Sequence, residues 1–323
     1  MPSYSGSYAT PRLDLGRAMW EYMIGANSFI GAGAVGAAVL PIFETMKKAA
    51  SFSKITRESI LRSRNVKRAP RAAYSRDEYE AKDQAYSCEE RGHEQPLDDG
   101  ERELYASDFD AELAAARIAG NVVLTEQERD VSAMVFNTTT WTGAPLYTDR
   151  SGTPWATVST DIIGHVLAAK EKVRANTGIK ANALVISEAV LATCLKANTA
   201  IKAAIQYTSI PTEENVLRAL SGLLGLKYIL VGDAVRNSAK EGQAFVGADV
   251  WSATYAMIAR IAESNDLTEP CIGRTLLWSA DSPDNATAEE YREEQTRSNI
   301  FRVRQHVDEV VFDANYGHLL KIA

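Results

Sequence analysis

The segment from residue 51 to about residue 103 constrains the fold most, because it is long, polar and poor in large apolar side chains. Residues 51–76 carry eight Lys or Arg and one acid, whereas residues 77–112 carry fourteen Asp or Glu and three bases. Strand-like stretches flank the turn-prone sequence APRAA, which predicts a long two-stranded ribbon. Such a ribbon buries too little apolar surface to be stable alone, so it must lie on another surface; a solvated, partly disordered loop is the alternative.

The stretches on either side of the ribbon differ in character. Residues 1–50 are rich in Gly, Ala and Ser and have no sustained hydrophobic period, which indicates an extended arm with little core of its own. From Leu104 onward, apolar residues recur at spacings of three and four. This periodicity predicts a helix of about 28 residues that follows a cap at Ser107 and ends near Asn137.

The rest of the chain alternates helices and strands. A second helix is expected from Asp161 to Gly178, with Thr160 as its cap. The apolar stretch ALVIS predicts a buried strand, and residues 299–322 are dominated by strand formers. The body is therefore expected to be of the α+β class.

Gly31, Gly33 and Gly36 have the G-x-G-x-x-G spacing of dinucleotide-binding proteins, but the context that this motif needs is missing. No buried strand precedes the glycines, Pro41 interrupts the helix that should follow them, and Ser51 stands where an acid is needed. The spacing arises easily by chance in a stretch rich in Gly and Ala. We therefore predict no cofactor site here.

Other catalytic and metal-binding patterns are missing too. The sequence has no G-x-S-x-G motif, and its four histidines are dispersed without an H-E-x-x-H or clustered Cys/His spacing. Acid pairs such as Glu89 with Glu90 lie in polar runs, which is typical of solvated charge. The prediction is no catalytic residue, no cofactor and no metal, in a protein that is not an enzyme.

Charge and cysteine content exclude further classes. The formal net charge of -7 and the pI near 5.3 argue against a broad nucleic-acid-binding surface. Cys88, Cys194 and Cys271 are far apart in the sequence and are expected to be unpaired thiols. The most apolar window, residues 29–43, is too short to span a membrane, and the N-terminal residues lack the pattern of a secretory signal.

The order of these segments resembles the major capsid protein of tailed bacteriophages, with the Hong Kong 97 type of coat fold. FIGAGAVGAAVLPIFETMKKAASFSKITRESIL is similar to the arm that leads into the family's extended loop, and AARIAGNVVLTEQERDVSAMVFNTTTW is similar to its spine helix. The resemblance covers nearly the whole chain. It implies an α+β fold whose parts are an N-terminal arm (1–50), an extended β-hairpin loop or E-loop (51–103), a peripheral domain with a long spine helix (104–175 and 286–323) and an axial domain (176–285).

The resemblance also implies that the arm and the E-loop contact neighbouring copies, where small residues permit close backbone approach. The arm residues expected in such contacts are Phe29, Ile30, Val39, Leu40, Ile42 and Phe43. The E-loop residues expected there are the bases Arg62, Arg64, Lys67, Arg68, Arg71 and Arg76 and the acids Glu89, Glu90, Glu94, Asp98 and Asp99. The two charged blocks could pair between adjacent copies or across the ribbon of one copy, and both arrangements are open.

The implied function is self-assembly, through pentamers and hexamers, into the icosahedral shell that encloses the double-stranded DNA of a tailed phage. The DNA would be held only as non-specific contents. Residues 1–50 lack the heptads of an attached scaffolding segment, so a separate scaffolding protein is expected, with a portal and a decoration protein as further partners. No membrane partner is expected. The expected location is the virion, after assembly in the host cytoplasm.

One further feature of the family and two alternative functions accompany this interpretation. Some relatives form Lys to Asn isopeptide crosslinks, for which the candidates here are Lys67, Lys82, Asn299 and Asn315. An encapsulin-like nanocompartment would share the fold but enclose cargo enzymes. A dinucleotide-binding enzyme is the third choice.

Overall fold

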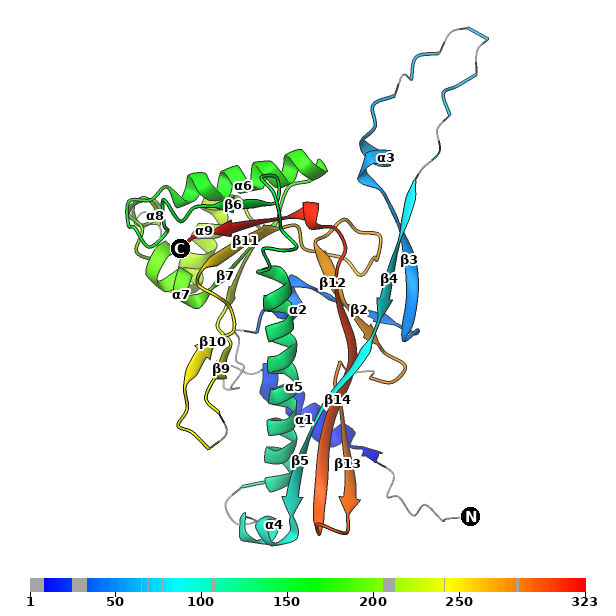
Figure 1. Ribbon diagram of the computed structural model, residues 1–323, viewed down its shortest axis with the longest axis vertical. Helices are drawn as coiled ribbons and strands as arrows, with labels where there is room; N and C mark the ends of the chain where they lie inside the picture. The colour runs from blue at the N-terminus through cyan, green and yellow to red at the C-terminus, as the bar shows by residue number, and fades with distance from the viewer. Residues whose placement is uncertain are drawn as a thin grey trace.

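The computed structural model describes residues 9–24, 34–64, 66–68, 70–71, 73–76, 78, 80–105, 109–205, 213–240, 242–282 and 285–323. A long helix, α5 (Ala111–Val135), runs along one β-sheet and reaches a second sheet at its C-terminal end (Figure 1). The side chain of Asp110 caps α5 by accepting the backbone N–H groups of Glu112 and Leu113, both at 3.1 Å. The predicted cap, Ser107, lies outside the described residues.

The larger sheet is built on the 14-residue strand β14 (Ser298–Val311). Strand β5 (Glu89–Asp98) pairs antiparallel with one edge of β14, while β13 and β12 follow each other along the opposite edge. Strand β1 extends the sheet beyond β13, and β2 pairs in parallel with β12. The bounds of these strands are β1 Thr10–Pro11, β2 Ile42–Thr45, β12 Gly273–Trp278 and β13 Thr287–Glu293.

Helices α5 and α1 (Leu13–Ile24) cover one face of this sheet. Helix α1 packs on α5 and on the sheet, and α4 (Asp99–Tyr105) connects β5 to α5 at the lower end in Figure 1. The buried apolar side chains of this interface are Leu15, Met19, Leu97, Ala111, Ala115, Ala116, Ala119, Val123, Ala286, Ala288, Phe301 and Val303.

The second sheet has the strand order β6-β15-β11-β7-β8. Its bounds are β6 Tyr147–Asp149, β7 Ala183–Ser187, β8 Tyr228–Gly232, β11 Tyr255–Ala259 and β15 Gly317–Lys321. The ALVIS strand, β7, is buried along its whole length, as predicted. The helices of this body are α6 Ile162–Thr177, α7 Glu188–Val190, the π-helix η2 Leu191–Leu195, α8 Thr199–Ile205 and α9 Glu213–Leu224.

Helix α6 follows the sequence prediction closely. Its cap is Asp161, whose side chain accepts the N–H of Gly164 at 2.8 Å, and it ends at Gly178 in the left-handed region with φ 74°. Thr160, the cap predicted from the sequence, instead donates its hydroxyl to the carbonyl of Pro154 at 2.8 Å. The side chain of an N-cap residue accepts the backbone N–H of the residue two or three positions after it. Asp161 does this with Gly164, so Asp161 and not Thr160 is the cap.

Two segments of the expected peripheral domain pack on the second sheet. Helix α6 and strand β15 lie with the second sheet, whereas the boundaries 104–175 and 286–323 place both in the domain of the spine helix. A short 3-10 turn, η3 (Ala314–Tyr316), follows β14 and redirects the chain from the larger sheet to the second one. The sequence has a continuous run of strand formers across this turn, so no local pattern indicates that the chain changes sheet here.

An apolar cluster joins the two sheets at the C-terminal end of α5. The N-terminal arm contributes to it through α2 (Gly36–Val39) and the residue that follows. The buried members of the cluster are Val35, Val39, Leu40, Val131, Val135, Trp141, Ala183, Val185, Trp251, Met257, Ala259, Ile261, Ile272 and Leu319. The described part of the arm is therefore folded onto its own chain and is not extended.

Two further pairs of strands lie outside both sheets. Strands β9 (Val235–Asn237) and β10 (Gly247–Asp249) form a hairpin beside α5, and β3 (Ala49–Ile55) pairs antiparallel with β4 (Ala81–Ser87) (Figure 1). The three cysteines are buried and unpaired, in agreement with the prediction.

Candidate assembly surfaces

The predicted ribbon exists, but it is shorter than the charge pattern suggests. Strands β3 and β4 pair in register from Ala49 opposite Ser87 to Ile55 opposite Ala81. The connection between them includes α3 (Arg57–Leu61) and projects beyond both sheets (Figure 1). We call residues 49–87 the E-loop from here on.

The base of the E-loop rests on the turn that follows β14. The rings of Phe52 and Phe312 lie with their centroids 4.9 Å apart, and the ammonium of Lys54 donates to the carbonyl of Phe312. The guanidinium of Arg57 donates to the carbonyl of Asn176 at the end of α6, at 3.1 Å. These few contacts fix the direction in which the loop leaves the body.

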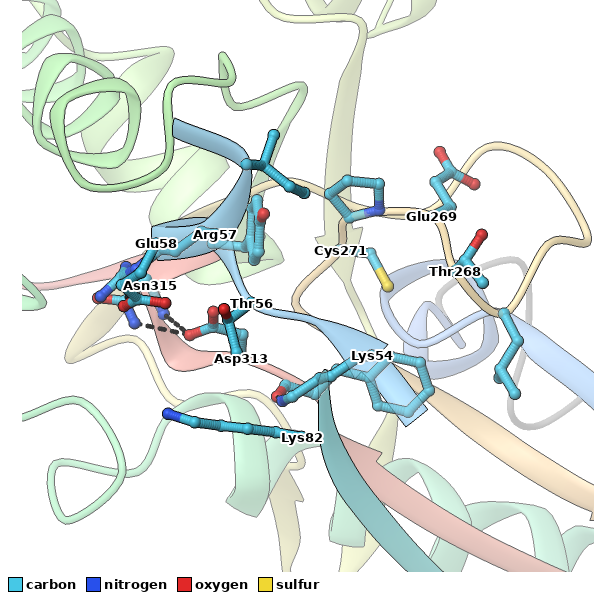
Figure 2. Close-up of a pocket in the computed structure, with 15 residues that line it drawn as sticks. Lys54, Thr56, Arg57, Glu58, Lys82, Thr268, Glu269, Cys271, Asp313 and Asn315 are labelled. Carbon is cyan, nitrogen blue, oxygen red and sulfur yellow. Dashed lines mark hydrogen bonds and ion pairs between the residues drawn. The ribbon is translucent and has the colours of Figure 1, made fainter. Parts of the chain in front are cut away.

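A cavity of about 420 Å³ lies beside these contacts (Figure 2). Lys54 and Lys82 line it from the ribbon, and Asp313 and Asn315 line it from the turn. Asn315 donates its amide to Asp313 at 2.6 Å, so this crosslink candidate already has a partner within its own chain. Crosslinking of Lys67 or Lys82 to Asn299 or Asn315 stays a prediction.

The tip of the E-loop is basic and also exposes apolar side chains. Val66 is 79% exposed and Tyr74 is 71% exposed. The guanidinium of Arg68 lies 4.7 Å from the centre of the Tyr74 ring, and Arg71 has a φ of 66° in the turn between them. The predicted interface bases that lie exposed on this tip are Arg62, Arg64, Lys67, Arg68, Arg71 and Arg76.

The predicted interface acids lie in β5 and α4, outside the E-loop, which corrects the ribbon boundary at residue 103. Strand β5, which holds most of these acids, pairs with β14 and not with β3. Its less exposed residues alternate with its acids and face α5. It is therefore a strand of the larger sheet, although its polar sequence does not indicate a buried strand. Because the basic block is at the tip of the E-loop and β5 pairs with β14 in the larger sheet, the acids of β5 do not lie opposite the basic block across the ribbon (Figure 1).

Several of the predicted interface acids have partners within their own chain. Asp99 forms an ion pair with Arg292 at 2.6 Å, and this arginine holds the pKa of the carboxyl below its usual range. Glu94 lies 3.6 Å from Arg302. The remaining three are Glu90, which lies 3.7 Å from His306, Asp98, which accepts the N–H of Gly100 at 2.8 Å, and Glu89, which is exposed at the start of β5.

The arm residues divide into three groups. Phe29 and Ile30 lie outside the described residues, as do Gly31 and Gly33. Val39 and Leu40 are fully buried in the cluster that joins the sheets, so within this conformation they have no surface left for a neighbour. Ile42 and Phe43 are half-buried in β2, where they pair with Thr275 and Leu276.

Sequence reasoning missed the polar contact that holds the arm. Gly36 approaches the carboxylate of Glu128 on α5, and the indole of Trp251 meets the same carboxylate. The expected close approach of a small arm residue is therefore present, but against the chain's own spine helix. A signal was available, since Glu128 lies three residues before Val131 on the apolar stripe of the helix.

Among the described residues, no cluster of three His, Cys, Asp or Glu side chains could hold a metal ion. The same part of the chain contains no helix that is long and apolar enough to cross a membrane.

No family model matches the chain. In sequence it is 25% identical over 285 residues to the major capsid protein of Burkholderia phage BcepMu. This alignment covers 86% of this chain and 89% of that protein. In structure it is similar to a phage-related protein from Bordetella bronchiseptica RB50, with a TM-score of 0.70, 17% identity and 98% of each chain covered.

Other solved shells share the architecture. A chain from the capsid of cyanophage P-SCSP1u matches with a TM-score of 0.59 at 11% identity, covering 88% of this chain and 86% of that one. An encapsulin from Synechococcus elongatus PCC 7942 matches less well, with a TM-score of 0.50 at 9% identity and 91% and 88% coverage. The fold is the Hong Kong 97 type of coat-protein fold, of the α+β class, as the resemblance implied.

Proposed function

We infer that the chain is a major capsid protein that self-assembles into the shell of a tailed-bacteriophage head. The observation that carries this conclusion is the match to a phage major capsid protein over most of both sequences, on a chain with the coat-protein fold. The role is structural, and the place of the assembled protein is the virion.

The E-loop supports an assembly function physically. It projects from the body of one copy (Figure 1). Its exposed Val66 and Tyr74 contribute stabilising apolar burial only when another surface covers them. The basic tip suits an acidic partner surface, which the outward side of β5 and α4 provides on an adjacent copy. Exposed ion pairs are worth only about 0–1 kcal/mol each, so these charges set register more than they hold the shell together.

The arm contributes less to contacts between copies than its sequence predicts. Its fully buried residues stabilise their own chain, and only Ile42 and Phe43 among its described candidate residues retain some exposed surface. Assembly in the host cytoplasm, on a separate scaffolding protein and with a portal and a decoration protein, belongs to the same proposal.

The second candidate is an encapsulin-like compartment, because an encapsulin has the same fold. The phage interpretation is preferred because the sequence relative is a phage capsid protein. The contents of purified shells distinguish the two: nuclease-protected duplex DNA indicates a phage head, and an enzyme cargo indicates a compartment.

Electron microscopy of the full chain, expressed alone and with its candidate scaffolding protein, tests the proposal. We expect closed shells of uniform diameter in at least one of the two samples. A protein that stays dispersed in both samples, at concentrations where relatives form shells, would contradict it.

A further inference from the structure

One buried carboxylate joins the arm, the spine helix and the loop between β10 and β11. Glu128 on α5 is 4% exposed, and its two oxygens accept three N–H groups. Its Oε1 accepts the backbone N–H of Val35 at 2.8 Å and the indole N–H of Trp251 at 2.6 Å. Its Oε2 accepts the backbone N–H of Gly36 at 2.8 Å. Three segments that are far apart in the sequence therefore share one acceptor group.

No Lys, Arg or His within the described ranges forms an ion pair with this carboxylate, so its stabilisation depends on the three N–H donors. Burial raises the pKa of the Glu128 carboxyl, and the hydrogen bonds from Trp251, Gly36 and Val35 oppose that rise. A buried acceptor is costly to leave incompletely bonded. Loss of any one donor therefore weakens the arrangement that holds the other two.

Steric fit fixes the donors in place. A Cβ atom on Gly36 would lie 2.6 Å from Oε2 of Glu128, so a larger residue there would force the arm or the carboxylate to move. A Cβ atom on Gly232, at the end of β8, would lie 2.2 Å from the Trp251 ring, so the indole fills a slot. The ring also packs edge-on against Phe136, with centroids 5.3 Å apart.

We propose that Glu128 is a positioning residue for assembly, which couples docking of the arm to docking of the Trp251 loop on the spine helix. Each segment then stays docked more tightly when the other is docked, and by linkage the effect is equal in both directions. The inference rests on the proposed function in one respect: undocking would uncover Val39 and Leu40 for contact with a neighbouring copy. The coupling itself is a property of the single chain.

Hydrogen exchange on the full chain tests the coupling, read on peptides that cover residues 34–46 and 250–257. Gly36→Ala introduces a steric conflict with the carboxylate from the arm side, and Trp251→Phe removes the indole N–H from the loop side while keeping an aromatic ring in the slot. We expect each variant to accelerate exchange in both peptides, by about tenfold for the loss of one buried hydrogen bond. Peptides from α6 should exchange as in the unaltered chain.

Glu128→Gln should accelerate both peptides as well, because its amide nitrogen cannot accept the N–H of Gly36. The matched control is Glu126→Gln, a half-exposed position on the same helix that pairs with Arg129 at the surface, and it should change neither. If Glu128→Gln also accelerates exchange in α6, its effect is on global folding, and the reciprocal pair Gly36→Ala and Trp251→Phe decides the question.

The proposal is wrong if Gly36→Ala accelerates exchange only in the arm peptide and Trp251→Phe only in the loop peptide, because the two contacts are then independent. Electron microscopy of the unaltered chain keeps the two inferences apart. Absence of shells would contradict the proposed function while leaving the measured coupling intact, and normal shells with no coupling would contradict only the inference made here.

Discussion

Glu309 on β14 is buried and accepts two hydrogen bonds from the guanidinium of Arg91 on β5, at 2.8 and 2.7 Å. The same guanidinium lies 3.4 Å from Asp130 on α5, so one arginine ties two strands to the spine helix. Burial raises the pKa of the Glu309 carboxyl, and Arg91 opposes that rise. Removing only one member of the pair should therefore destabilise the fold more than removing both.

Arg91→Ala should lower the free energy of unfolding by about 3–5 kcal/mol, because it leaves Glu309 buried without its partner. Chemical denaturation followed by circular dichroism measures this loss. Combining Arg91→Met with Glu309→Met removes both charges and should cost clearly less. Equal losses in the single and double variants would show that packing, and not the unpaired carboxylate, is responsible.

His318 on β15 is a buried imidazole held in its neutral form. Its Nδ1–H donates to the carbonyl of Pro145 at 2.8 Å, and its Nε2 accepts from the hydroxyl of Thr148 at 2.9 Å. The ammonium of Lys172 donates to the same hydroxyl at 2.7 Å, which orients it. Burial lowers the pKa of His318 to about 4.

This depressed pKa makes stability depend on pH in a defined window. The unfolded chain takes up a proton on His318 near its ordinary pKa of about 6.5, whereas the folded chain does so only near 4. The contribution of His318 to the free energy of unfolding is therefore fully present above about pH 6.5. As the pH falls toward 4, the chain loses about 1–3 kcal/mol of stability from this residue. In urea denaturation at several pH values, the free energy of unfolding of His318→Gln should fall less steeply with decreasing pH than that of the unaltered chain.

Among the elements, those with a local signal could be predicted from the sequence. Helix α6 has its acidic cap and the terminal Gly178, and the uniformly apolar β7 has the pattern of a buried strand. Strand β5 could not be recognised, because only Leu97 among its residues is both apolar and fully buried. Its pairing with β14 depends on residues some 200 positions away, which no local pattern reports.

The candidate surfaces also divide into features with a local sequence signal and features that depend on distant residues. The basic tip of the E-loop is a local feature, and its bases lie exposed together as their spacing indicates. The burial of Val39 and Leu40 could not be predicted, because their partners come from α5, β7, β11 and β15, and the sequence alone does not say whether an apolar arm residue meets its own chain or another. Contact between copies stays a prediction for the charged residues.

Charge reversal at the E-loop tip tests that contact. Arg68→Glu with Arg71→Glu should leave the melting temperature within about 2 °C of the unaltered chain, because both side chains are exposed. Shell yield by electron microscopy should fall severalfold, because like charges then face the acidic surface of a neighbour. Arg174→Glu with Arg218→Glu makes the same change in net charge on exposed helical positions and should assemble normally. Unchanged assembly by the tip variant would count against contact between copies.

At the scale of the whole molecule, the chain divides into a body that completes its own core and a loop that does not. The described part of the arm, the spine helix and both sheets share buried apolar clusters within one copy. The described residues of the E-loop tip belong to no such cluster, and Val66 and Tyr74 are open to solvent. We therefore expect folding and assembly to be separable, with different residues supplying the free energy for each.

Replacing residues 62–79 by a short Gly/Ser linker should separate the two processes. The base contacts of Phe52, Lys54 and Arg57 remain, so we expect a soluble, cooperatively folded chain whose melting temperature changes by no more than about 3 °C. The same chain should form no closed shells, because the surface that a neighbour would cover is gone. Differential scanning calorimetry and electron microscopy measure the two properties on one sample. Loss of cooperative unfolding would mean that the loop stabilises its own body, and shells of normal diameter would mean that copies associate through other surfaces.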